Sequence, residues 1–193
     1  MKLRLLAIAA IAASSLTVFA GSKQARQITP QPLMTCDLSG ADADFLSTAA
    51  KTQQVQLLVG QIASARASES ELQLLGKALF EDADRERDAL AQLAAEKQFP
   101  IAAIRSPEVQ ALLNRLLKLA GTKLDKKLLD TILANEKQRA AAYGAAMASS
   151  DEKISAYAVE HYPSVQENLL LVSKLAGVPL PKELPPVAEP PAK

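Results

Sequence analysis

The sequence predicts an all-α protein whose domain is an antiparallel four-helix bundle with one extra short connecting helix. The first reason is that apolar residues recur at helical spacing through most of residues 41–177. The second is that the breaks between these segments carry residues that cap helices. The third is composition, since the chain has no Trp, four Phe and three Tyr. The core must therefore consist mainly of Leu, Ile, Val and Ala, which suits close packing of helices.

The first twenty residues are typical of a bacterial signal peptide. They combine the basic residues Lys2 and Arg4, an apolar run over residues 5–19, and small residues before the expected cut. A retained membrane anchor is the alternative, but the run is shorter than the ~20 apolar residues that span a bilayer. Lipidation at Cys36 is rejected because this cysteine lies far beyond the apolar run. We therefore expect cleavage after residue 20, no transmembrane span afterwards, and a location in the periplasm or cell envelope, including association with the outer membrane.

Charge content argues against electrostatic binding of nucleic acid or anionic lipid, and cysteine content excludes a disulfide within the chain. Removing residues 1–20 takes away two of the 22 basic residues and none of the 21 acidic residues, which leaves a net charge of −1. A chain this close to neutral offers no electrostatic case for binding nucleic acid or anionic lipid. Because Cys36 is the single cysteine, no disulfide forms within the chain.

The prolines divide the chain into segments. Of eleven prolines, two precede the first helical segment and six lie in residues 179–191. We therefore expect a flexible lead over residues 21–40, the helical bundle domain over residues 41–177, and a Pro-rich disordered tail over residues 178–193. Such a tail is a candidate for docking on another envelope component.

The first two helices are predicted from their caps and apolar faces. Ser39, with Asp42 three residues later, is expected to cap the first helix. Ser68 and Glu71 are expected to form a capping box for the second helix, which should end near Gln98. The residues expected to point inward are Phe45, Ala49, Val55, Val59 and Ile62, then Leu72, Leu75, Leu79, Leu90 and Leu93.

Three further helices are predicted after the proline at position 100. The Ser-Pro-Glu sequence at residues 106–108 predicts the start of a short helix, which Gly121 should stop. A long helix is expected over residues 123–148, and Ser149 with Glu152 is expected to cap the last helix. The residues expected to point inward are Leu124, Leu128, Ile132, Ala140, Tyr143 and Met147, then Ile154, Tyr157, Val165, Leu169 and Val172.

Three glycines interrupt the predicted helices, at Gly60, Gly76 and Gly144. Each costs ~1 kcal/mol of helix stability relative to Ala. Two interpretations remain open, because such glycines either permit neighbouring helices to approach closely or are tolerated weaknesses.

No residue pattern specifies a catalytic site, and no cofactor is expected. His161 is the single histidine, which excludes a multi-histidine metal site and most Ser-His or Cys-His schemes. The charged residues 81–87 are interpreted as a solvated face with pairs within the helix. Glu136 falls on an inward stripe, since the residues four positions to either side of it are apolar. The alternative is that Glu136 is a boundary residue paired with Arg139.

Four short motifs follow one another along the predicted helices. They are Asp44-Phe45-Leu46 opening the first helix, Asp82 late in the second, Leu124-Asp125 opening a later one, and Tyr162-Pro163 inside the last. In this order and spacing the chain resembles, over about residues 41–177, the exported bacterial family called domain of unknown function 4142. The resemblance implies a ferritin-like helical bundle in the periplasm or at the outer membrane.

Typical members of that family carry three histidines that this chain lacks. The matching positions hold Ala83, Glu136 and Asn168. Metal or proton chemistry by those histidines therefore does not carry over. As a candidate for holding a hard cation, the sequence leaves Glu136, with His161 and Asn168 from the last helix as neighbours.

Three hypotheses about function follow. The favoured one is a non-catalytic helical bundle with a binding or structural role in the envelope, whose partner would be another envelope component. The second is a degenerate ferritin-like metal-binding or redox protein built around Glu136. The third is an apolar-ligand carrier that uses a gap left beside Gly76 and Ala83. The sequence does not decide whether the protein is an enzyme, and a non-enzymatic role is the expectation.

Overall fold

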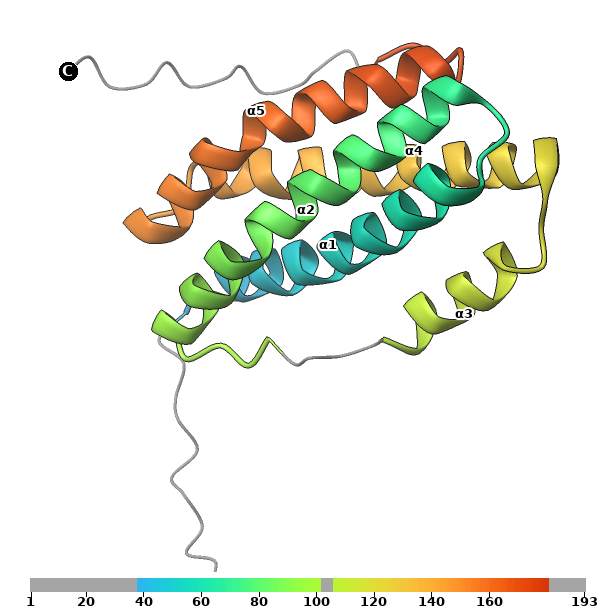
Figure 1. Ribbon diagram of the computed structural model, residues 1–193. Coiled ribbons are helices and arrows are strands. Elements are labelled where there is room, and N and C mark those ends of the chain that lie inside the picture. The colour runs from blue at the N-terminus through green and yellow to red at the C-terminus, as the bar shows by residue number, and fades with distance from the viewer. Residues whose placement is uncertain (1–37, 102–105, 181–193) are drawn as a thin grey trace, which may run out of the picture. The chain divides into compact units, whose positions relative to one another are not determined.

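Five helices occupy the residues that the computed structural model describes, which are 38–101 and 106–180 (Figure 1). They are α1 (Gly40–Arg66), α2 (Ser70–Glu96), α3 (Pro107–Leu116), α4 (Gly121–Ala146) and α5 (Glu152–Leu175). The predicted all-α fold with four long helices and one short connecting helix is confirmed. The predicted signal peptide, nearly all of the predicted lead, and the predicted tail from residue 181 onward lie outside the described residues.

Polar contacts at the helix ends establish the direction of each long helix. Lys97, just after α2, forms an ion pair with Asp151, just before α5. Arg66, the last residue of α1, donates from Nη2 to the carbonyl oxygen of Leu119, just before α4, at 2.8 Å. Each long helix therefore runs antiparallel to the two long helices beside it, as predicted.

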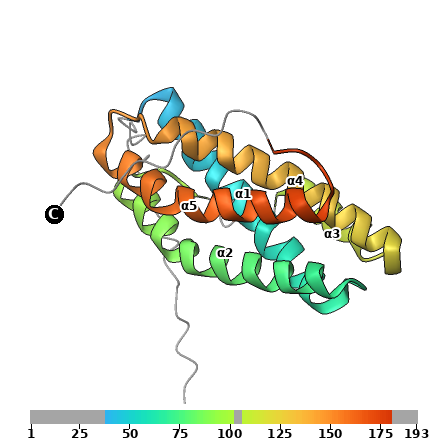
Figure 2. The same cartoon turned by 90° about the horizontal axis from the view of Figure 1, so that it is seen from above.

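One consequence of these directions is that α2 and α4 run the same way (Figure 2). The chain must therefore return along the bundle between them, and α3 lies on this return (Figure 1). α3 packs against α1 and α4. A single long crossover of this kind distinguishes the bundle from one in which every connection is short.

Two predicted caps are confirmed. The Ser39 hydroxyl accepts a hydrogen bond from the backbone N–H of Asp42 at the start of α1. The Ser106 hydroxyl accepts one from the N–H of Val109 at the start of α3. In both cases the serine satisfies a first-turn N–H that has no partner within the helix.

The predicted capping box of Ser68 and Glu71 is wrong. α2 begins at Ser70, and its N-cap residue Glu69 makes no side-chain capping bond. Ser68 instead donates from its backbone N–H at 2.9 Å, and from its hydroxyl, to the carboxylate of Asp125 on α4. A tertiary contact thus takes the hydroxyl that the local pattern assigned to the helix.

Two further local predictions are also wrong. Gly121 is the first residue of α4, with φ +56°, and does not stop α3. α5 is capped by Asp151, which accepts from two first-turn N–H groups, and not by Ser149. The Ser149 hydroxyl donates to Asp42 Oδ1 at 2.6 Å, so it joins the end of α4 to the start of α1.

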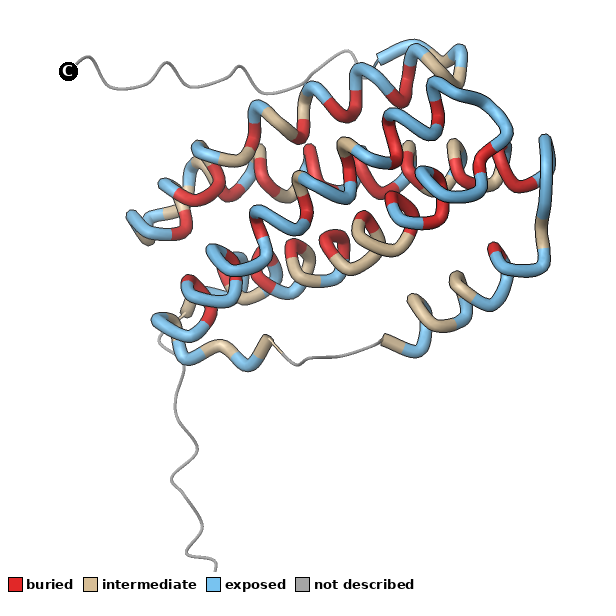
Figure 3. Tube along the Cα trace, viewed as in Figure 1, coloured by how far each residue is buried: buried red, intermediate tan, exposed pale blue. Residues whose placement is uncertain are grey.

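The core lies between the four long helices and is mostly apolar (Figure 3). All residues predicted to point inward are buried except Val55 and Met147, which are partly buried. Several charged residues are buried as well, among them Glu86, Glu136 and Arg139. Burying charge is costly unless it is paired, so the middle of the bundle, where these residues lie, is the candidate functional site.

α1 and α2 approach each other closely at Gly60 and Gly76. A Cβ on Gly60 would lie 2.8 Å from the carbonyl oxygen of Gly76 and 2.8 Å from the backbone nitrogen of Phe80. A Cβ on Gly76 would lie 2.5 Å from Cβ of Ala63. Only glycine permits such contacts, so the close-approach interpretation is confirmed for these two residues. The gap proposed beside Gly76 for an apolar ligand is filled by α1.

Candidate functional site

The central polar side chains form one group around Arg139, here called the Arg139 cluster: Glu86 on α2 with Glu136, Arg139 and Tyr143 on α4. Arg139 donates from Nη2 to Glu86 Oε2 at 2.7 Å and from Nη1 to Glu136 Oε2 at 3.2 Å. The Tyr143 hydroxyl donates to Glu86 Oε2 at 3.4 Å. The side chains of Arg139 and Glu136 are 0% exposed and that of Glu86 is 4% exposed. One guanidinium therefore joins two buried carboxylates from two helices.

Helical spacing brings the α4 members of this cluster together. Glu136, Arg139 and Tyr143 lie at i, i+3 and i+7, so all three point from one face of the helix. Asn135 beside them donates to Glu136 Oε1 at 3.3 Å and to the carbonyl oxygen of Thr52 on α1 at 3.1 Å. This pair of bonds holds the Glu136 carboxyl in place and joins α4 to α1.

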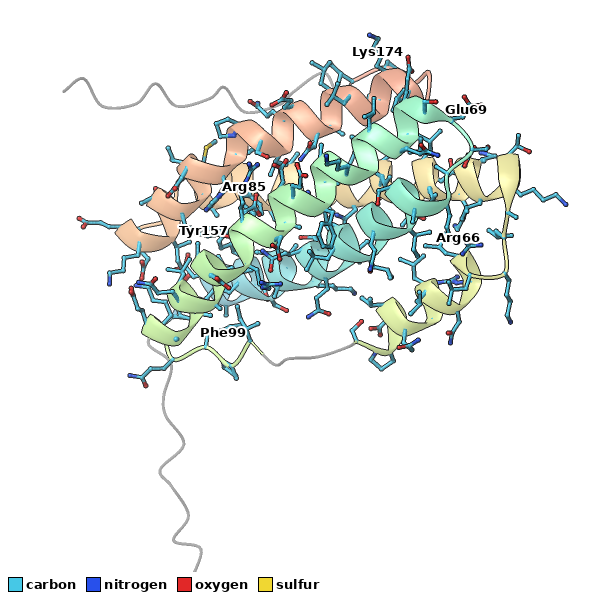
Figure 4. All side chains as sticks on the ribbon, viewed as in Figure 1. Arg66, Glu69, Arg85, Phe99, Tyr157 and Lys174 are labelled. Carbon is cyan, nitrogen blue, oxygen red and sulfur yellow. The ribbon has the colours of Figure 1, made fainter. Side chains whose placement is uncertain are left out.

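Aromatic rings pack beside the Arg139 cluster. The guanidinium carbon of Arg139 lies 5.3 Å from the centre of the Tyr143 ring, a cation–π distance. Phe45 meets Tyr143 edge to face at 5.3 Å between ring centres. The ring of Tyr157, which is labelled in Figure 4, lies 6.1 Å from that of Tyr143. His161 follows at 4.4 Å from Tyr157. These rings link α1, α4 and α5 around the buried charges.

Burial and charge change the ionisation of the cluster. Burial raises the pKa of Glu136 above its ordinary value. Burial alone would lower the pKa of Arg139, but the charges of Glu136 and Glu86 raise it overall. Burial also raises the pKa of Tyr143 to about 12. With one guanidinium between two carboxylates, a proton on Glu136 brings the cluster to zero net charge.

A second polar group, here called the Asp82 cluster, joins α2 to α5 one helical turn away. It consists of Asp82 and Arg85 on α2 with Ser164 and Asn168 on α5. Asp82 Oδ2 accepts from Ser164 Oγ at 2.9 Å and from Asn168 Nδ2 at 3.0 Å. Arg85, labelled in Figure 4, forms an ion pair with the other oxygen of Asp82. The carboxylate thus has partners on both of its oxygens.

The predicted candidates Glu136, His161 and Asn168 do not form one site. Glu136 pairs with Arg139, as the alternative interpretation predicted, but it is fully buried and not at the boundary. His161 Nδ1 lies 3.9 Å from Glu86 Oε1, and Asn168 binds Asp82. His161 and Asn168 therefore each contact α2, but at different residues, Glu86 and Asp82.

The residues of the Arg139 cluster do not fit a metal ion. Di-iron bundles supply Glu from two helices and a Glu-x-x-His pair from each of the other two. Here Glu136 is followed three residues later by Arg139, whose guanidinium has no lone pair to offer a metal. It also pairs with both carboxylates that a metal would need. Within residues 38–101 and 106–180, no group of three or more His, Cys, Asp or Glu side chains has a metal-binding arrangement.

Glu86 is the central residue that the sequence interpretation missed. The interpretation of residues 81–87 as a solvated face is wrong for Glu86, which is buried, although the expected pairs within the helix are present. A signal was available, because Glu86 lies seven residues after Leu79 and four before Leu90. That spacing places it on the inward stripe of α2.

Comparison with known proteins shows the family of the chain. The family model described as Domain of unknown function (DUF4142) matches residues 28–175. No curated protein and no solved structure matches the chain. Among the described helices, none combines the length and apolar character needed to cross a membrane. Because the family model matches well over half of the sequence, the chain belongs to the family of domain of unknown function 4142.

Proposed function

We propose that this protein is an exported bundle of the bacterial cell envelope with a non-catalytic binding or structural role. The observation that carries the proposal is the position of Arg139 between Glu86 and Glu136. Arginine stays charged and ligates no metal, so each central carboxylate is paired with a guanidinium within the protein, while Oε1 of Glu86 accepts no hydrogen bond. The centre of the bundle therefore serves the fold, and the surface is left to carry the function.

The proposal includes a ferritin-like origin for the scaffold. One long crossover between two parallel helices is the connectivity of ferritin-like bundles, and residues 97–120 make such a crossover. The spacing of Glu136 and Arg139 matches that of a Glu-x-x-His pair, with arginine in place of histidine. In this proposal an internal guanidinium has taken over the charge-balancing role of a metal ion.

Export is tested by locating the protein in cells. The full chain and a variant lacking residues 2–20 are expressed, and the cytoplasmic and envelope fractions are compared. The full chain should appear in the envelope fraction in a shortened form, because a signal peptide is removed on export. The variant should stay in the cytoplasm at full length. Equal distribution of both forms contradicts export.

The metal-free centre is tested on protein purified from its own compartment. Elemental analysis should find no stoichiometric Fe, Mn or Zn, and adding each metal should leave the Tm unchanged, since a ligand raises Tm only by binding the folded state. Glu136→Gln is the matched control, because it keeps the shape of the side chain. Metal that is retained by the natural protein and lost from Glu136→Gln overturns the proposal in favour of a metal-binding role.

A role through the surface is tested by crosslinking in intact cells. The natural protein should crosslink to a discrete envelope component, and the buried variant Tyr143→Phe should leave that crosslink unchanged. A variant lacking residues 181–193 reports whether the tail takes part. If no crosslinked species forms with any variant that remains abundant and folded, the binding role is overturned.

A further inference from the structure

An open groove lies at the end of the bundle where α2 and α4 begin and α5 ends. Its volume is about 430 Å³, within the size range of ligand pockets. Glu69 and Lys174, labelled in Figure 4, mark this end of the molecule. Leu72, Leu129 and Leu175, one from each helix, give the groove an apolar lining. We call this feature the acidic groove because of the side chains that surround the leucines.

Negative charge dominates the edge of the acidic groove. The edge carries four carboxylates, on Glu69, Glu71, Asp125 and Asp130, and one ammonium group, on Lys126. Lys174, next to Leu175, adds one positive charge at this end. The starts of α2 and α4 each add about half a positive charge and the end of α5 about half a negative one, so roughly −1.5 charges remain. The helix ends therefore reduce the negative charge but do not cancel it.

The four carboxylates differ in how far they are already engaged. Asp125 accepts hydrogen bonds from Ser68, and Asp130 pairs with Lys126 at 3.2 Å. Glu69 and Glu71 are exposed, and no ion pair joins either of them to another described residue. Glu69 also makes no capping bond to α2, although it occupies the N-cap position. These two side chains are available to a positively charged partner.

Exposed leucines continue the apolar lining away from the acidic groove. Leu74 is 69% exposed and follows Glu71 by three residues, so both point from the same side of α2. Leu171 is 40% exposed and precedes Leu175 by four residues on α5. A partner that follows this surface therefore meets apolar and acidic groups together on α2, and apolar groups on α5.

We propose that the acidic groove binds a cationic amphipathic segment of another protein. Its Lys or Arg side chains meet Glu69 and Glu71, and its Leu, Ile or Val side chains enter the leucine lining. The same charge argues against an anionic membrane surface, and the leucines argue against a purely polar cation. The inference rests on the proposed binding role and adds the surface and the chemistry of the partner.

The first test is calorimetric titration of the exported protein with a short synthetic peptide in which lysine and leucine alternate. In an extended chain this pattern presents the two residue types on opposite sides. We expect binding that weakens as the salt concentration rises. A peptide with serine in place of leucine, and spermidine, should bind at least about tenfold more weakly, because burying one leucine is worth more than that factor. Equal binding of these probes, or of a glutamate–leucine peptide, overturns the inference.

The second test places the binding at the groove. The double variant Glu69→Lys with Glu71→Lys should bind the lysine–leucine peptide about tenfold more weakly, since two exposed charge contacts are reversed. The control is Glu81→Lys with Asp88→Lys, which changes net charge equally at exposed positions further along α2. Equal weakening in both doubles shows attraction by overall charge alone and overturns the inference.

The cellular crosslink separates this inference from the proposed function. The double variant at Glu69 and Glu71 should lose the crosslinked envelope partner, and the control double should keep it. If both doubles keep the partner, the acidic groove is not the docking surface, and the proposed binding role stands. If no variant ever forms a crosslink, the proposed binding role fails as well.

Discussion

α2 packs against its two neighbours in opposite ways. Against α1 its backbone is in direct contact, because Gly60 and Gly76 leave no side chain between the helices. Against α5 the contact is less extensive, and it includes hydrogen bonds from Ser164 and Asn168 to Asp82. The same helix thus has one interface set by volume and another set largely by polar groups.

The α1–α2 and α2–α5 interfaces are therefore sensitive to different kinds of substitution. The α1–α2 interface excludes any added atom, since interiors are close-packed and relax little. The α2–α5 interface and the Arg139 cluster beside it depend on charge balance, so they respond to protonation and to loss of a partner. Volume changes should therefore act mainly on the first interface, and charge changes mainly on the second.

The largest expected effect comes from removing the central cation. Arg139→Met leaves Glu86 and Glu136 buried without their partner and should lower the free energy of unfolding by about 3–5 kcal/mol. Urea unfolding measures this loss. The triple variant with Glu86→Leu and Glu136→Leu should recover most of the stability, because an apolar set replaces a buried ion pair well. A small loss in Arg139→Met would show that the carboxylates do not need the guanidinium.

The next effect tests the volume-limited interface. Gly76→Ala places a Cβ 2.5 Å from Cβ of Ala63 and should lower the free energy of unfolding by about 1–3 kcal/mol through overpacking. The control is Gly40→Ala, since a Cβ at Gly40 would meet nothing within 4 Å. The same urea experiment compares them. Equal stability of the two variants would mean that α1 and α2 separate without cost.

A smaller loss is expected at the polar interface. Asn168→Ala removes one of the hydrogen bonds to Asp82, which keeps Ser164 and Arg85 as partners. The expected loss is about 0.5–1.5 kcal/mol of unfolding free energy, the usual net worth of one hydrogen bond. Asn114→Ala, at an exposed position on α3, is the control and should stay within about 0.5 kcal/mol. A loss in Asn168→Ala as large as that in Gly76→Ala would erase the distinction between the interfaces.

The smallest effect is a dependence on pH. Because the pKa of Glu136 is raised above 4.5 in the folded protein, the folded state holds a proton that the unfolded state has released. Stability from this group is therefore present at low pH and is lost as pH rises above 4.5. Glu136→Gln lacks this loss, so its stability relative to the natural protein should increase with pH. Thermal unfolding at several pH values above 4.5 measures this difference in stability, with Glu160→Gln at an exposed position as the control. A difference between Glu136→Gln and the natural protein that does not change with pH contradicts the prediction.

Periodicity and capping patterns were enough to predict most of the fold. The buried residues of the four long helices recur with a period of 3.6 residues. They could therefore be identified from the sequence alone. The caps were less predictable where a distant group competed. Ser68 binds Asp125 on α4 and Ser149 binds Asp42 on α1, and neither partner is visible in the local pattern.

The candidate site shows the same limit. Glu136 and its partner Arg139 are three residues apart on one helix, so their pairing was foreseeable from spacing. Glu86 is on another helix, in a run of charged residues that resembles a solvated face. Only the packing of α2 on α5, with the Arg139 side chain reaching Glu86 from α4, shows that this carboxylate turns inward and that His161 and Asn168 face α2.

The sequence by itself determined the helices, their apolar faces and the family to which the chain belongs. These depend on neighbours a few residues apart or on the order of short motifs. The tertiary structure decided how the central charges are balanced, which caps form, and where acidic and apolar side chains gather at the bundle end. The physical reason is that a charged group lowers its energy through whichever partner lies nearest in space, and that partner is set by the packing of distant segments.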